Sequence, residues 1–151
     1  MRRLVIALTV VCGLVPASAA AGPWEVIERE GQNRAAVSNG NGTISLNIFC
    51  GGDGAMVGIE RAADVPWLGS QPAELVIEGE AFPIVPLAEG DTWAVFNIDP
   101  IGLKPAMVGA LRAGAKFEIR GPATSDIETG ALAFTLEGSS RALDEVPGGC
   151  T

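Results

Sequence analysis

Two β-hairpins are encoded in one stretch of the chain, NGNGTISLNIFCGGDGAMVGIE, from Asn39 to Glu60. Asn-Gly pairs favour the positive φ angles of tight hairpin turns, so Asn39–Gly42 predicts a turn into a strand at Thr43–Cys50. Every second position of that strand is apolar, which is typical of a strand with one buried face: Ile44, Leu46 and Ile48. Gly51–Gly54 then predicts a second turn, and Ala55–Glu60 the returning strand.

Similar short patterns, separated by turn residues, extend in both directions from this stretch. They predict further strands at Trp24–Glu28, Ala35–Ser38, Leu75–Ile77, Phe82–Leu87, Thr92–Ile98, Lys116–Arg120 and Leu132–Glu137. Pro83 and Pro86 should place Phe82–Leu87 at a sheet edge or make it irregular, because proline cannot donate a hydrogen bond to a neighbouring strand. Seven to nine short strands are expected in all.

Two segments change to a helical period. Leu103–Arg112 carries an apolar stripe, with Pro105 in its first turn and Gly114 just past its end. A shorter helix is expected after Gly138, with Ser139 or Ser140 as its N-cap, and Ala142, Leu143 and Val146 form its buried side. The predicted fold class is therefore mainly β: an antiparallel β-sandwich or curved sheet with one mid-chain helix and one short C-terminal helix.

The N-terminus has the three parts of a secretory signal peptide: a basic start, a short apolar run at Leu4–Val15, and small residues at Ala17–Ala19. We expect residues 1–21 to be a cleaved signal, cut before Ala20 or Gly22, and residues 22–151 to form a single β-rich periplasmic domain. The apolar run is too short for a permanent anchor, so no stable membrane insertion is expected after cleavage.

Cleavage would leave an even pair of cysteines, Cys50 and Cys150, in an oxidising compartment. The chain contains no histidine, so a Cys/His zinc site is excluded, and two thiolates alone make a poor metal site. We therefore predict a structural disulfide between them. Cys12 lies within the apolar run after Val10 and Val11, a pattern that does not favour lipoprotein acylation.

The chain is acidic, with a formal net charge of −8, and loss of Arg2 and Arg3 would make it −10. Binding to nucleic acid or to anionic lipid requires clustered basic residues, so neither is an expected partner. The acidity provides solubility, or an acidic face for a basic partner.

The absence of histidine also removes the usual general base and the Ser-His-Asp and Cys-His mechanisms. No nucleophile elbow and no phosphate-binding glycine loop occurs, so no catalytic, cofactor-binding or metal-binding residue is predicted. The remaining possibility for catalysis is a carboxylate pair taken from Glu78, Glu80, Asp91 and Asp99, which could act as in glycoside hydrolysis.

Three tryptophans are candidates for contact with a sugar or a peptide. Trp24 and Trp93 lie in alternating strands and are expected in the core. Trp67 lies in a loop between Pro66 and Gly69, so it is the candidate for an exposed partner contact.

Two segments resemble small exported proteobacterial proteins: FTLEGSSRALDEVPGGC, Phe134–Cys150, and MVGALRAGAKFEIRG, Met107–Gly121. Both are similar to the invasion-associated locus B family, although its mid-domain cysteine pair is absent here. The first segment, together with LNIFC ending at Cys50, also resembles the periplasmic accessory proteins associated with type VI secretion. These are packing motifs, so the resemblance implies a fold and carries over no catalytic residue.

From these observations we expect a non-enzymatic periplasmic protein that binds an envelope protein or an envelope polymer. The alternatives are the carboxylate-dependent hydrolase and a carrier that holds a small ligand in the apolar interior of the β-structure.

Overall fold

A computed structural model of the protein describes residues 22–65, 71–121, 132–146 and 150. These residues form nine strands, a 3₁₀ turn and two α-helices. In chain order the elements are β1 (Glu25–Arg29), β2 (Gln32–Ser38), β3 (Ile44–Gly51), β4 (Gly54–Arg61), β5 (Ala73–Ile77), β6 (Glu80–Glu89), β7 (Trp93–Ile98), η1 (Ile101–Leu103), α1 (Lys104–Ala113), β8 (Lys116–Arg120), β9 (Ala133–Thr135) and α2 (Ser139–Asp144).

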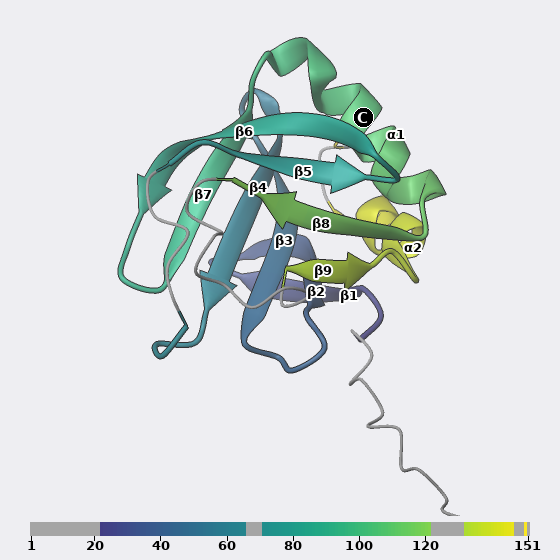
Figure 1. The fold of residues 1–151 in the computed structure, drawn as a ribbon. Helices are drawn as coiled ribbons and strands as arrows, with labels where there is room; N and C mark the ends of the chain where they lie inside the picture. Colours follow the sequence, from purple (N-terminus) through teal and green to yellow (C-terminus); the bar gives the residue numbers. More distant parts are fainter. Residues whose placement is uncertain (1–21, 66–70, 122–131, 147–149, 151) are drawn as a thin grey trace, which may run out of the picture.

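All nine strands belong to one antiparallel sheet in the order β1-β2-β3-β4-β7-β6-β5-β8-β9. Figure 1 shows the sheet rolled around its core, with β3 and β4 crossing steeply behind β5 and β8, and with α1 and α2 together at one side. The mainly β fold with a mid-chain and a C-terminal helix is confirmed, and it takes the form of a curved sheet. Both hairpins predicted from Asn39–Glu60 are present as β2–β3 and β3–β4.

The inner face of the sheet is apolar and buried. Alternate residues of β3 and β4 point inward, and Ile48 lies opposite Val57 with neither exposed to solvent. The same alternation in β7 turns Phe96 and Ile98 inward. The intervening residues of β3, β4 and β7 therefore point to the outer face of the sheet, and some of them are polar.

Trp24 joins the two edges of the rolled sheet. Its backbone N–H donates to the Glu137 carbonyl at 2.8 Å, and its indole Nε1–H donates to the Thr135 carbonyl at 2.8 Å. The side chain is 1% exposed and lies 6.1 Å from the Phe117 ring, which stacks on Phe134. The prediction that Trp24 belongs to the core is confirmed. The sheet is not closed, but here its first and last strands are held together.

Strand β6 lies inside the sheet, between β5 and β7, so of the two predicted alternatives, an edge strand or an irregular one, the edge strand is wrong. The prolines are accommodated at two special positions. The Pro83 carbonyl faces β7 and accepts from Asp99 N–H at 3.1 Å, one residue beyond the end of that strand, so the missing proline N–H falls at the end of the β6–β7 ladder. Pro86 precedes a bulge, which confirms the predicted irregularity.

Both predicted helices are present. Pro105 lies in the first turn of α1, and Gly114 is its C-cap, as expected. The predicted serine cap of α2 is wrong, because the N-cap is Gly138 and makes no side-chain cap. Ser139 Oγ instead donates to the Leu111 carbonyl at 2.6 Å and ties α2 to the end of α1. The predicted buried side of α2 is confirmed.

The predicted disulfide between Cys50 and Cys150 is present, with 5.6 Å between the two Cα atoms. Cys50 lies at the end of β3, partly buried against the core, and Cys150 is 3% exposed. The bond therefore fixes the chain that follows α2 to a central strand.

Candidate functional site

A groove of about 580 Å³ lies across the outer face of the sheet. Its floor is formed by β3 and β4, one side by the β1–β2 hairpin, and the other side by β7 and the end of β6, in line with the strand order. The lining residues are Arg29, Glu30, Arg34, Asn47, Gly58, Ile59, Glu60, Leu87, Ala88, Thr92, Trp93, Ala94 and Val95. Distant parts of the sequence therefore contribute to one surface.

The floor of the groove depends on a glycine. Gly58 lies directly opposite Asn47 in the β3–β4 ladder. A Cβ atom at position 58 would lie 2.5 Å from Asn47 Oδ1, so the Asn47 amide can lie over β4 only because residue 58 has no side chain. Asn47 is 2% exposed, which is unusual for an amide on the outer face of a sheet.

A chain of polar contacts crosses the groove from β1 to β4. Arg34 Nη2 pairs with Glu30 Oε2 at 3.2 Å, and Arg34 Nη1 donates to Asn47 Oδ1 at 3.5 Å. Asn47 Nδ2 then donates to Glu60 Oε1 at 3.5 Å, and Glu60 forms an ion pair with Arg29. Positive and negative groups alternate along this chain, so the groove holds two cations and two anions in paired positions.

Arg34 is the most buried charge of the groove, at 9% exposure. Its guanidinium carbon lies 4.4 Å from the centre of the Phe49 ring, which is a cation–π contact. Burial lowers the pKa of Arg34 below its ordinary value, while the charge of Glu30 raises it and the charge of Arg29 lowers it. Its buried Nε has no hydrogen-bond partner among the described residues, so this guanidinium is held mainly by Phe49, Glu30 and Asn47.

Trp93 forms one side of the groove, and the prediction that it belongs to the core is wrong. The indole is 43% exposed, because Phe96 and Ile98 occupy the inner face of β7 and Trp93 falls on the opposite face. Its five-membered ring lies against Gly90, where any Cβ atom would clash with it. Trp93 is also the cross-strand neighbour of Glu60. The groove thus combines a supported aromatic ring with an adjacent carboxylate.

Leu87 is a lining residue that the sequence reasoning missed. In the β6–β7 ladder Pro86 lies opposite Phe96 and Ala88 lies opposite Val95, so Leu87 is the extra residue of a bulge. It is 56% exposed, and Pro86 beside it was the available sequence signal. The predicted contact residue Trp67 lies outside the described residues.

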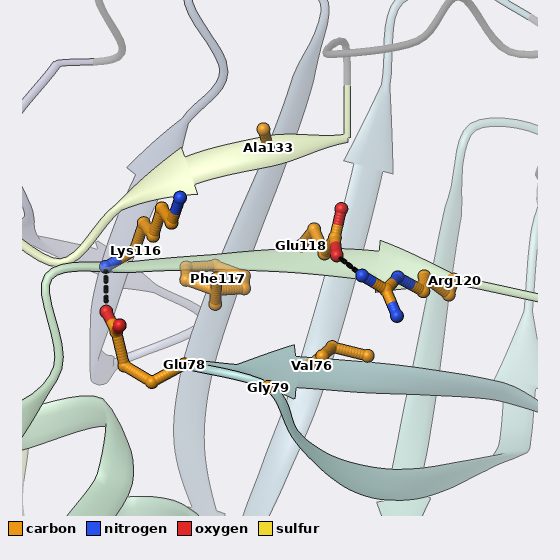
Figure 2. Close-up of a pocket in the computed structure, with 8 residues that line it drawn as sticks. All are labelled: Val76, Glu78, Gly79, Lys116, Phe117, Glu118, Arg120 and Ala133. Carbon is orange, nitrogen blue, oxygen red and sulfur yellow. Dashed lines mark hydrogen bonds and ion pairs between the residues drawn. The ribbon is translucent and has the colours of Figure 1, made fainter.

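A second, smaller pocket of about 320 Å³ lies over β5, β8 and β9. Figure 2 shows its side chains, with Glu78 turned toward the backbone N–H of Lys116 and with Glu118 paired to Arg120. Glu78 Oε1 accepts from the N–H groups of Ala115 at 2.8 Å and Lys116 at 3.0 Å. Glu78 therefore caps the turn between α1 and β8.

The four candidate carboxylates of the hydrolase alternative are spread over the sheet. Glu78 and Glu80 flank the β5–β6 turn, whereas Asp91 lies in the β6–β7 turn at the other end of β6. Asp99 follows β7, near Pro83. Of the four, Glu78 alone lines either of the two pockets described above. Neither pocket brings two of them together.

The capping role of Glu78 predicts a pH dependence of stability. The bonds from Ala115 and Lys116 lower the pKa of Glu78 below its ordinary value of 4.5, against a smaller desolvation effect that raises it, and the charge of Lys116 lowers it further. A carboxylate whose pKa is lower in the folded protein than in the unfolded chain stabilises the fold at every pH above its unfolded-state pKa. This stabilisation is lost as the pH falls through the folded-state pKa.

Glu78→Gln should therefore lower the melting temperature at pH 7 and have a diminishing effect as the pH falls below 4.5. Thermal unfolding of both proteins between pH 7 and about pH 3 measures this. Glu80→Gln is the matched control, with a carboxylate two residues away. A difference between Glu78→Gln and the parent protein that stays constant over the whole range would contradict the capping role.

Within the described part of the chain, no group of three or more His, Cys, Asp or Glu side chains is placed to hold a metal ion. No helix in the same residues is long and apolar enough to cross a membrane. No known protein family, curated protein or solved structure matches the chain.

Proposed function

We propose that this is an exported, non-enzymatic binding protein that holds an envelope protein or an envelope polymer in the outer-face groove. The proposal includes the signal peptide over residues 1–21 and a periplasmic location, as the sequence predicts. The disulfide supports an oxidising compartment. The observation that carries the proposal is the exposure of Trp93 and Leu87 along one groove on the outer face.

Exposed large apolar residues that gather around a concave surface are a feature of binding sites. Three large apolar side chains are markedly exposed in the described residues: Leu87, Trp93 and Ile101. The first two line the groove, and Ile101 does not. Their concentration at a groove with fixed polar groups supports recognition of a ligand. The two carboxylates of this groove, Glu30 and Glu60, are each held in an ion pair with an arginine.

In vivo crosslinking in the periplasm tests the proposal. The wild-type protein should form a discrete crosslinked adduct that survives purification, and Trp93→Ala should reduce its yield by about tenfold, since exposed aromatic anchors dominate binding energies. Ile101→Ala is the matched control, because Ile101 is 52% exposed but lies away from the groove. An adduct formed equally well by Trp93→Ala would contradict the proposed function, as would a protein that forms no adduct under any growth condition and also binds no envelope polymer.

A further inference from the structure

We propose that the ligand of the outer-face groove is an uncharged saccharide chain, with one sugar ring stacked on Trp93. This inference rests on the proposed binding function and specifies the chemical class of the ligand. Three features of the groove carry it: its charge balance, the seating of the indole, and its position on the central strands.

The charges of the groove are already paired with one another. Arg29 pairs with Glu60, and Arg34 pairs with Glu30, so the lining residues carry no net charge. This contrasts with the protein as a whole, which has a net charge of −8. An anionic polymer would meet Glu30 and Glu60, and a basic peptide would meet Arg29 and Arg34. Charge complementarity therefore favours an uncharged ligand.

The indole of Trp93 is arranged as a platform with polar groups beside it. It rests on the backbone at Gly90 and still exposes 43% of its surface. Glu60 is its direct neighbour on β4, and the Asn47 amide bonds Glu60 from the next strand. A sugar ring has an apolar C–H face and a rim of hydroxyl groups. The flat ring next to the partly exposed Glu60 carboxylate and Arg29 guanidinium matches both parts of such a ring.

The position of the groove disfavours an extended peptide. Its floor and one side are made of β3, β4 and β7, each of which is paired with a strand on both sides. Their backbone N–H and C=O groups are used within the sheet, so a peptide cannot bind here by adding a strand. Saccharide hydroxyl groups can bond to polar side chains of the kind that line the groove. A bound saccharide, unlike a peptide, has no peptide backbone whose N–H and C=O groups would be left without partners.

The test titrates the intact mature protein with two neutral oligosaccharides, fully N-acetylated chitotetraose and maltotetraose, by calorimetry and by tryptophan fluorescence. At least one should bind, and raising the salt from about 0.05 M to about 0.5 M should change the affinity less than about twofold, because no charge pair with the ligand is screened. Trp93→Ala should weaken binding by about tenfold or more. Ile101→Ala should leave it unchanged, and Leu87→Ser provides a second groove variant if Trp93→Ala folds poorly.

Binding of neither oligosaccharide up to millimolar concentration, or binding that Trp93→Ala and Leu87→Ser leave intact, would overturn the saccharide assignment. Tight, salt-sensitive binding of polyglutamate or polylysine at the groove in place of the sugars would also overturn it. If the sugars fail but the Trp93-dependent crosslink persists, the binding function stands with a protein partner. If both fail, the proposed function fails as well.

Discussion

Replacing Cys150 with serine is expected to lower the melting temperature of the mature protein by roughly 10–25 °C. The bond joins residues 100 positions apart. In the chain-entropy model a loop of that length stabilises the folded state by about 4–5 kcal/mol, which corresponds to that shift for a domain of this size. Differential scanning calorimetry with and without reductant measures the effect.

The structural reason is that the disulfide reinforces the docking of a short helix. The helix is six residues long, which is marginal without tertiary contacts. It docks through Leu143 and, just beyond its end, Val146, both nearly inaccessible to solvent. The disulfide attaches the chain after the helix to Cys50 on β3. Loss of the bond should therefore release α2 first and make the C-terminus sensitive to proteases.

Cys50→Ser should have the same effect as Cys150→Ser, and reductant should have no further effect on either variant. Thiol titration of the unreduced mature protein should find close to no free thiol. Two reactive thiols per chain, or a melting curve that reductant does not move, would show that the bond does not form in the protein.

The elements with strong local signals could be predicted from the sequence. The strict alternation from Ile44 to Ile48 and the flanking Asn-Gly and Gly-Gly turns are enough to define β3 and its two hairpins. In the same way, Pro105 and Gly114 mark the ends of α1. The disulfide followed from the count of cysteines and the expected compartment. Each of these inferences uses residues that are close in sequence or a constraint that does not depend on topology.

The groove could not be predicted, because it depends on strand order. The pairing of β4 with β7 brings Glu60 next to Trp93, and no local pattern indicates that neighbour. The alternation of residues in β7 places Trp93 and Phe96 on opposite faces of the strand, but it does not indicate which of the two faces is turned toward the core. Pro86 signalled irregularity, whereas the bulge that exposes Leu87 depends on pairing with β7. Non-local pairing therefore determines most of the candidate site.

Replacing Trp24 with alanine should destabilise the protein by about 3–5 kcal/mol, the usual cost of removing a large buried aromatic side chain. The loss has two parts. The indole fills the core beside Phe117, and its Nε1–H is the donor to the Thr135 carbonyl on β9. Trp24→Phe distinguishes the packing contribution from the hydrogen-bond contribution, because it keeps most of the apolar contact and removes the donor. This substitution should destabilise the protein by about 1–2 kcal/mol. Urea unfolding followed by circular dichroism gives both values.

Trp93→Ala is the matched control for Trp24→Ala, since it removes the same side chain from the outer face. Its effect should stay within about 0.5 kcal/mol, because a partly exposed ring leaves no core cavity. The contrast separates two roles of one residue type: Trp24 holds the first strand against the last, and Trp93 faces the groove. Equal destabilisation by the two substitutions would mean that Trp93 packs into the fold, and it would remove the exposed ring on which the binding proposal depends. A stable Trp24→Ala protein would mean that the junction between β1 and β9 is not needed to keep the sheet rolled.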